Sequence, residues 1–510
     1  MMAFTWMDLA AITLTVVCVI ILRLSLTRSK PPLPPGPTRW PVVGSLFSLP
    51  ESGNMFDAFT EWSNQYGEVT FAQILNQSIV IINSYEAALE LLEHRSILYS
   101  QRPRMVMANE LVGWEPCLAT MPYGINHRRM RKIIHEGTSP KAMETLRPAQ
   151  EREALKFVQR LLDTPGDLHQ HIRQTAGATL IKLVYGYEIE TRHDYFLDLA
   201  EKAVDMFSVV TTPGSFMVDT FPWLKILPWA PFKTKAKEWQ KLVTRLLEEP
   251  AGYTRQCMER GKFEPCLLAG WLERAGEQGA EKDEMLIKWA ATTIYSAGID
   301  TTVSSVSFFF AHMVHHPDIQ AAAQAEIDRV VGTQRLPTYS DRESLPYVEA
   351  LFKEVLRWHP AAPFGIPHQL DSDQDDVYKG MRIPRGSLII PNIRAMTRNP
   401  NVYHDPDGFT PERFLNGDGI AESDPGAFVF GFGRRRCPGI HIAHSSVWLS
   451  IALTLAVYDI TPYVGADGTP ELPTLGYSRT TISQPEPFKC TIKLRSMATK
   501  KLVEDSVIIN

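Results

Sequence analysis

Apolar positions recur at helical spacing along most of the chain, and the two longest such stretches lie in its second half. One runs from residue 285 to 314, and the other follows Pro438 to about residue 455. Similar spacing predicts shorter helices elsewhere (56–66, 139–208, 233–260 and 347–358). Runs rich in β-branched residues predict strands (68–74 and 78–82) and a final hairpin (474–482 with 488–494). The pattern predicts a mainly α-helical protein with a smaller β-rich region, of the α+β class.

Bulk composition makes the chain globular, with room for a large core. It has 510 residues, 44% hydrophobic and 21% charged, and a formal net charge of −5 with both signs mixed throughout. No internal repeat or low-complexity tract divides the sequence, and this charge balance argues against nucleic-acid binding. The six cysteines are sparse and lack C-x-x-C spacing, which argues against a zinc site or disulfide framework and favours a reducing compartment.

The N-terminal 22 residues are apolar except for Asp8 and a few threonines, and basic residues follow them (Arg23, Arg28, Lys30 and Arg39). A cleaved signal peptide would carry its charges before the apolar run and end at small residues, which this stretch does not. We therefore predict a transmembrane signal anchor over 1–24 with its basic flank in the cytosol. A basic, proline-rich hinge over 25–44, a main domain over 45–496 and a tail over 497–510 complete the predicted organisation.

Residues 209–232 combine four prolines with apolar and aromatic residues such as Trp223 and Trp229. The prolines preclude one long helix. A tryptophan-bearing apolar loop fits a segment that dips into the membrane interface, and a buried loop fits the composition equally well.

The segment 430–439 (FGFGRRRCPG) places one cysteine directly before the long apolar helix that follows Pro438. Cys437 thus lies where a loop enters a helix, and unpaired N–H groups and the helix dipole there favour a thiolate. Three glycines permit tight turns and close approach to a flat object (Gly431, Gly433 and Gly439). Neighbouring arginines can bind carboxylates. These features fit axial ligation of a haem with propionates; the alternative is a buried structural cysteine in a glycine-rich turn.

The apolar stretch 285–314 is interrupted by Ala297, Gly298, Asp300 and Thr301. Glycine within a helix costs about 1 kcal/mol relative to alanine, and a buried aspartate needs a partner. Gly298 would let a ligand approach the helix backbone, and Asp300 with Thr301 would supply an acid and an alcohol that relay protons. The alternative is a polar kink whose groups are satisfied internally.

Glu354 and Arg357 lie three residues apart and so on one face of the predicted helix 347–358. Such a pair is common on helix surfaces. Arg413, in the later segment Pro-Glu-Arg-Phe, makes the combination more specific and predicts a structural ion-pair network.

The cysteine loop matches the pattern F-x-x-G-x-R-x-C-x-G (at Phe430, Gly433, Arg435, Cys437 and Gly439). It resembles the haem-binding loop of the cytochrome P-450 family. The segment 297–302 resembles that family's [AG]-G-x-[DE]-T-[TS] oxygen-activation segment, and Glu354-x-x-Arg357 with Arg413 resembles its E-x-x-R network. Together with the anchor and hinge, these ordered motifs extend the resemblance to about residue 496. The chain most resembles fungal microsomal members that tailor secondary metabolites.

The resemblance implies haem b between a long distal helix and a proximal helix, with the Cys437 thiolate as iron ligand. It implies propionate contacts for Arg435 and Arg131, and a role there for His368. His127 stands where the family usually carries tryptophan, which is a departure. Phe430, Ala297 and the loop glycines would also border the haem. The substrate pocket is expected to include residues from several segments (Trp114, Ile294, Ala361, Phe364, Ile366 and Tyr477).

The implied function is a monooxygenase that places one atom of O₂ in an apolar small molecule such as a terpenoid, polyketide or indole-type metabolite. Electrons would come from NADPH through a membrane-bound cytochrome P-450 reductase, with cytochrome b5 as a further partner, because the chain has no flavin- or NAD-binding G-x-G-x-x-G segment. The expected location is the endoplasmic reticulum membrane, single-pass, with a cytosolic catalytic domain. Two alternatives stay open: an isomerase or dehydratase that needs no O₂, and a non-catalytic haem-binding protein.

Overall fold

A computed structural model describes residues 30–50, 55–189, 191, 193–277, 283–415 and 422–509. The predicted signal anchor lies outside the described residues. The α-helices are α2 (Met55–Tyr66), α3 (Tyr85–Ala88), α4 (Ser96–Tyr99), α5 (Ile125–Thr138), α6 (Pro140–Asp163), α7 (Leu168–Tyr185), α8 (Tyr195–Thr211), α9 (Met217–Thr220), α10 (Pro231–Glu259), α11 (Leu267–Glu277), α12 (Glu284–His315), α13 (Pro317–Val330), α14 (Pro346–Trp358), α15 (Ile393–Thr397), α16 (Ile440–Val457) and α17 (Met497–Ile509). The predicted helices are confirmed.

Short helical turns connect these elements, and four of them matter for the site: η2 (Leu89–His94), η3 (Val106–Val112), η5 (Pro222–Ile226) and η10 (Gly433–Arg435). The segment 102–124, which has no regular pattern in the sequence, therefore contains one π-helical turn, η3.

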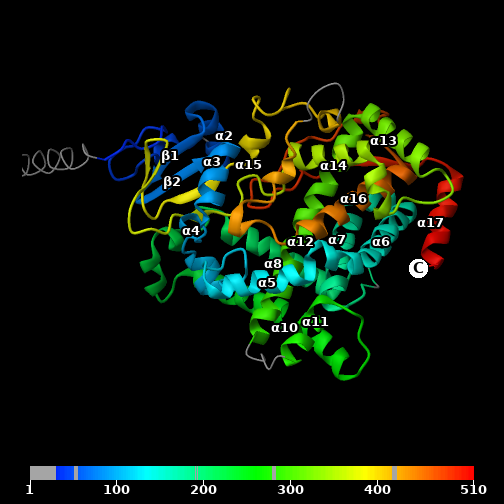
Figure 1. The fold of residues 1–510 in the computed structure, drawn as a ribbon, viewed down its shortest axis with the longest axis horizontal. Coiled ribbons are helices and arrows are strands. Elements are labelled where there is room, and N and C mark those ends of the chain that lie inside the picture. Colours follow the sequence, from blue (N-terminus) through cyan, green and yellow to red (C-terminus); the bar gives the residue numbers. More distant parts are fainter. Residues whose placement is uncertain are drawn as a thin grey trace, which may run out of the picture.

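The strands form three small sheets. They are β1 (Val69–Ile74), β2 (Gln77–Ile82), β3 (His368–Gln369), β4 (Asp376–Tyr378), β5 (Met381–Ile383), β6 (Leu388–Pro391), β7 (Tyr458–Val464), β8 (Pro470–Glu471) and β9 (Cys490–Leu494). The largest sheet has the order β1-β2-β6-β3, with β2 and β6 parallel and the other pairs antiparallel. Figure 1 shows β1 and β2 at one end of the molecule and α17 at the other, with α12 between them. The mainly α-helical prediction with a smaller β-rich region is confirmed.

The predicted final hairpin is wrong. β9 pairs antiparallel with β7, directly after α16, and Tyr458 lies opposite Leu494. The stretch before β9 contributes only an isolated bridge between Tyr477 and Pro485. Pro485 and Pro487 lie in the connection between the two predicted strands, and neither can donate to a strand ladder there.

α12 runs through the centre of the helical part and packs against α5, α7, α10, α11 and α16. Its near-continuous apolar sequence follows from this position, because a helix covered on all sides buries every face. α16 is, among the described residues, the one helix long and apolar enough to cross a membrane, but 72% of it is buried inside the protein. Its composition is therefore that of a core helix.

Both ends of the described chain pack on the body. In the predicted hinge, the carbonyl of Pro35 accepts from the Phe71 amide of β1 at 2.8 Å, and the carbonyl of Pro32 accepts from Arg382 at 2.7 Å. These bonds dock the stretch 30–44 along the sheet region. The segment set apart as a tail forms α17, which packs against α6 and buries Val503 completely.

Candidate active site

The loop before α16 folds tightly around its cysteine. The Cys437 amide donates to the carbonyl of Phe430 at 2.7 Å, closing the loop across η10. Gly431 and Gly433 have φ of 77° and 49°, a region that L side chains rarely adopt. A Cβ on Gly433 would lie 2.4 Å from the carbonyl oxygen of Leu92 in η2. Glycine is thus required here for the turn and for close packing on η2.

Cys437 is enclosed by protein, yet its side chain is accessible. It therefore faces an opening inside the fold. Burial raises the pKa of the thiol above its usual value, while the Gly439 N–H and the positive charges of Arg131 and Arg436 lower it less. The Gly439 N–H thus favours a thiolate, as expected for a helix start, but burial of the thiol outweighs it. A bound metal cation would deprotonate such a thiol directly.

A second accessible spot interrupts α12 where the sequence predicted it. Ala297 is exposed although its neighbours in this central helix are almost all buried. The Thr301 hydroxyl donates to the Ala297 carbonyl at 3.0 Å. Gly298 faces α7 instead, where an added Cβ would meet the Leu180 side chain at 2.8 Å. The absence of a side chain at Gly298 thus lets α12 pack closely on α7. Leu118 bonds to both Thr293 of α12 and Arg435 of the cysteine loop, so the expected haem cleft would lie between this part of α12 and Cys437.

Asp300 is buried beside this opening and has a partner that the sequence did not reveal. Its carboxylate lies 3.5 Å from Arg173 of α7, which also pairs with Glu201 at 3.0 Å and approaches Asp205 at 4.0 Å. Burial raises the pKa of Asp300 to about 6, and the Arg173 charge opposes that shift. The Gln484 side-chain amide donates to the Asp300 carbonyl at 2.8 Å. The acid is therefore held on both its side chain and its backbone.

Three arginines border the cysteine loop without an acidic partner: Arg102 is buried, and Arg131 and Arg435 are half-buried. Arg435 donates to the carbonyl oxygens of Ser100, Leu118 and Met121, at 2.8, 3.1 and 2.7 Å. Arg102 donates to carbonyls at 119, 366 and 367, and Arg131 to that of residue 436. In the described part of the chain, no carboxylate forms an ion pair with any of the three. Desolvation lowers the pKa of all three guanidinium groups, that of Arg435 to about 9.

His127 lies among these arginines with both ring nitrogens buried and unpartnered. Burial, with the charges of Arg435, Arg131 and Arg102, lowers its pKa to about 3. Buried cations and an unpaired imidazole are costly unless an anion compensates them. A flat group with two carboxylates, as haem carries, fits this donor set. Arg102 was not predicted from the sequence, because its only local signal is a charge in the irregular segment 102–124.

His368 is buried in β3, and its Nδ1 lies 2.7 Å from the carbonyl of Tyr99. Burial and the neighbouring Arg102 charge lower its pKa far below the usual value. The ring is therefore neutral, oriented by Tyr99, and adjacent to the same cluster of arginines.

The predicted ion-pair network forms on α14. Arg357 and Glu354 are fully buried and make a bidentate pair at 2.7 and 2.8 Å. Arg413 reaches Glu354 at 3.3 Å and Glu422 at 2.8 Å. Arg357 also donates to the carbonyls of residues 397, 406 and 408. The network holds the irregular segment that leads to the cysteine loop.

The predicted pocket residues do not form one group. Phe364 is in a satellite core, stacked on Phe56 at 4.8 Å. It packs there because its segment follows the sheet onto α2. Trp114 is buried edge-on against Phe207 and Trp289.

The other predicted pocket residues differ in burial and in their contacts. Ile294 is 6% exposed on α12, three residues before Ala297. Ala361 and Ile366 are half-buried, and the Ile366 carbonyl accepts from Arg102 at 2.6 Å. Tyr477 packs against His359 at 4.9 Å and under the Arg394 guanidinium at 4.9 Å. Arg394 thus orients the tyrosine by a cation–π contact.

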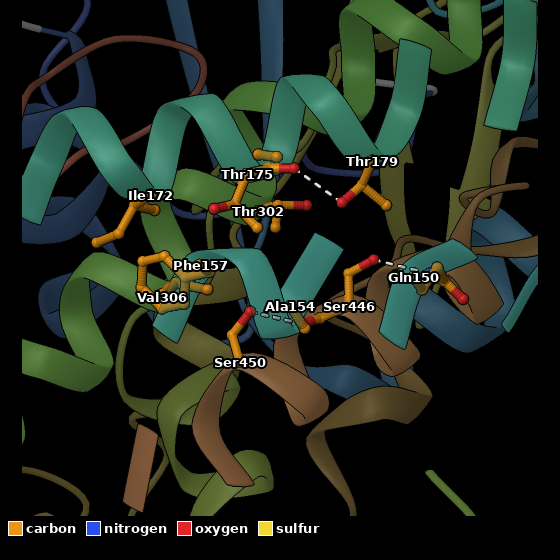
Figure 2. A pocket seen from close by; sticks show the side chains of 11 residues that line it. Gln150, Ala154, Phe157, Ile172, Thr175, Thr179, Thr302, Val306, Ser446 and Ser450 are labelled. Atoms are coloured by element: carbon orange, nitrogen blue, oxygen red, sulfur yellow. Dashed lines mark hydrogen bonds between the residues drawn. The ribbon is translucent and has the colours of Figure 1, made fainter. Parts of the chain in front are cut away.

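A separate small cavity lies between α6, α7, α12 and α16 (Figure 2). It encloses about 10 Å³, room for about one water. Its lining combines hydroxyl, amide and apolar side chains (Gln150, Ala154, Phe157, Ile172, Thr175, Ala176, Thr179, Thr302, Val306, Ser446 and Ser450). The predicted site residues are not part of this lining, so the cavity is distinct from the Cys437 cleft.

Comparison with known proteins gives a consistent result. The family described as Cytochrome P450 matches residues 34–490. The chain is 41% identical over 507 residues to Cytochrome P450 monooxygenase 208 of Postia placenta, covering 98% of each chain. It is 40% identical over 504 residues to Cytochrome P450 monooxygenase claR of Ampulloclitocybe clavipes, covering 96% of this chain and 93% of the relative. It is 37% identical over 503 residues to Cytochrome P450 monooxygenase ppsD of Aspergillus oryzae, covering 96% and 94%.

Proposed function

The chain belongs to the cytochrome P450 monooxygenases, and on that premise we propose that it oxidises an apolar small molecule of fungal secondary metabolism by inserting one oxygen atom from O₂. The observation that carries the proposal is an enclosed but accessible Cys437 beside three arginines without acids, one buried and two half-buried. That donor set suits haem b, with Cys437 as iron ligand and Arg102, Arg131 and Arg435 toward its carboxylates. When bound, haem supplies the activation of O₂.

The chain's own residues supply protons and shape. Asp300, with a pKa of about 6, can hold a proton near neutral pH and pass it toward the Thr301 hydroxyl on the next residue. Arg173 pairs with Glu201 and approaches Asp205, which is 71% exposed, so this charge cluster extends from Asp300 to the surface. Arg173 stays protonated and orients the Asp300 carboxylate.

Substrate and location follow from the apolar surfaces. The stretch 217–229 exposes large apolar side chains, with Trp229 90% and Ile226 81% exposed. Such a surface suits insertion into a membrane interface, which agrees with the predicted anchor and endoplasmic reticulum location. An apolar substrate dissolved in the membrane would reach the cleft from this side. Medium-sized terpenoid, polyketide or indole-type metabolites fit these properties.

Electrons would come from NADPH through a cytochrome P450 reductase, with cytochrome b5 as a second donor. Arg128 is exposed on α5 beside the cysteine loop and suits docking of an acidic partner, whereas the neighbouring Arg129 already pairs with Asp283. Arg434 is less suited, because it is half-buried and donates to Ser96 at 3.2 Å.

The decisive experiment combines a spectrum with product analysis. Membranes containing the full chain and a reductase are supplied with NADPH and candidate metabolites, and products are analysed by mass for one added oxygen. Cys437→Ala should abolish both the red-shifted ferrous–carbon-monoxide band and the product. Cys257→Ala changes another free cysteine and should retain both.

Two outcomes would contradict the proposal. Turnover without NADPH would indicate an isomerase or dehydratase, and a normal thiolate band in Cys437→Ala would exclude this residue as the ligand.

A further inference from the structure

A loop near the end of the chain binds the backbone of α12 at Asp300. The Gln484 side-chain amide donates to the Asp300 carbonyl at 2.8 Å, and the Ser304 hydroxyl donates to the Ser483 carbonyl at 2.6 Å. Asp300 and Ser304 are the first and last residues of one helical turn. The loop 478–484 is therefore attached to both ends of this turn.

The loop 478–484 is itself fixed by groups outside α12. Its two ends exchange hydrogen bonds: the Ser478 amide donates to the Gln484 carbonyl at 2.8 Å, and the Gln484 amide donates to the Ser478 hydroxyl at 2.9 Å. Ser483 is fully buried, and its amide donates to the Ala361 carbonyl at 2.8 Å. Its hydroxyl donates to the Ser478 carbonyl at 3.1 Å, so it accepts from Nε2 of His359 at 3.0 Å.

The carbonyl that Gln484 binds belongs to the peptide group that joins Asp300 to Thr301. Because a peptide group is planar, a bond to its oxygen also restricts its N–H, which belongs to Thr301. The Thr301 hydroxyl donates to the Ala297 carbonyl at 3.0 Å. Gln484 therefore restricts the backbone from which both the acid and the alcohol extend.

This contact is separate from the one that holds the Asp300 side chain. Arg173 lies 3.5 Å from the carboxylate, whereas Gln484 binds the backbone. The Oε1 atom of Gln484 is buried and has no partner within the described ranges of the chain. An unpaired amide oxygen costs free energy that an apolar side chain of the same length would avoid. The amide thus contributes less to stability than to the position of the Asp300 carbonyl.

We propose that Gln484 is a positioning residue for proton delivery, because it holds the peptide group between Asp300 and Thr301 against the loop 478–484. The proposal rests on the proposed function, which has Asp300 and Thr301 handle the proton. Substrate affinity does not require this peptide group. Loss of the contact should therefore lower the yield of product per NADPH and leave the affinity for substrate nearly unchanged.

The first test measures backbone hydrogen exchange in the haem-loaded full chain. Gln484→Met removes the donor and keeps a side chain of similar length, so the amides of 301–305 should exchange about fivefold faster, the effect of one lost hydrogen bond. Gln73→Met is the matched control. It removes an amide-to-carbonyl bond of 3.1 Å to Leu75 at the end of β1 and should leave the exchange of 301–305 unchanged. Equal exchange in Gln484→Met and the parent would overturn the proposal.

The second test measures how NADPH consumption is divided between product and hydrogen peroxide, using a metabolite that the parent converts. Gln484→Met should form about fivefold less product per NADPH, because protons reach O₂ in the wrong arrangement and leave with the electrons as hydrogen peroxide. The Kd of the metabolite, measured from its absorbance change, should stay within about twofold of the parent value. Gln73→Met should match the parent in both quantities. Unchanged coupling in Gln484→Met, or a loss of affinity as large as the loss of coupling, would reject a positioning role.

Gln484→Glu provides a second variant if Gln484→Met does not fold. It keeps the shape of the side chain, but an ionised carboxylate cannot donate to a carbonyl. It should show the same faster exchange and the same lower yield, and parent-like values of both would reject the proposal. A parent that shows no NADPH-dependent turnover would reject the proposed function, whereas a parent that turns over and variants that match it would reject the role of Gln484 alone.

Discussion

Two sets of arginines differ in whether a carboxylate compensates their charge. This difference distinguishes a structural network from a binding site. On α14, Arg357 and Arg413 share the carboxylate of Glu354, and Arg413 also reaches Glu422. Beside the cysteine loop, Arg102, Arg131 and Arg435 donate to carbonyl oxygens instead.

Carbonyl dipoles orient a guanidinium but do not neutralise it. Removing a charge from water costs several kcal/mol per ion unless an opposite charge is near. The first set is complete within the chain and therefore fixes the fold. The second set is complete only with an external anion, which marks a binding site.

Disrupting the compensated set should have the largest effect. Glu354→Ala leaves Arg357 as a fully buried cation without its acid, which should lower the free energy of unfolding by about 3–5 kcal/mol. Urea denaturation of the variant would measure this loss. Glu136→Gln breaks only exposed pairs with Lys132 and Arg274 and should change stability by less than about 1 kcal/mol. Equal effects of the two substitutions would show that the buried α14 network contributes no more to stability than an exposed ion pair.

The uncompensated set should respond with the opposite sign. Arg102→Met removes a buried cation, so the haem-free protein should be at least as stable as the parent. The same substitution deletes a charged donor toward the haem carboxylates, so haem should dissociate on the order of 10- to 100-fold faster. Denaturation of the haem-free form and transfer of haem to apomyoglobin measure the two effects. A haem-free Arg102→Met that loses stability as Glu354→Ala does would remove the distinction between the sets.

From the sequence, the compensated set was predicted, and of the other set Arg131 and Arg435 were named but Arg102 was missed. Glu354 and Arg357 are neighbours on one helix, so their spacing carries the signal. Arg102 is oriented by carbonyls 264 and 265 residues away, and Asp300 pairs with an arginine at a separation of 127 residues. Such contacts depend on how helices pack, which local periodicity does not encode.

The same limit explains the wrong hairpin. β9 has a suitable strand pattern, but its partner is β7 rather than the preceding residues. The strand was predicted correctly and its pairing partner was not.

Asp300 is intermediate between the two sets, because its charge is only partly compensated. Its substitution has the smallest expected effect. It is buried, but its single arginine at 3.5 Å is shared with Glu201, and its pKa is about 6 against a usual 3.8. Below pH 3.8 the acid is protonated in the folded and unfolded chains alike. Between about pH 4 and 6 the unfolded chain ionises first, so the native state loses stability as pH rises; above pH 6 the penalty is constant.

Asp300→Asn lacks this penalty. Its stability relative to the parent should therefore rise by on the order of 2 kcal/mol from pH 4 to pH 6 and then level off. Urea denaturation across this range measures the difference. Asp205→Asn, at a side chain 71% exposed near the same arginine, should show no such pH-dependent gain. If Asp300→Asn tracks the parent at every pH, then Arg173 compensates Asp300 fully, and this acid belongs with the α14 network rather than between the two sets.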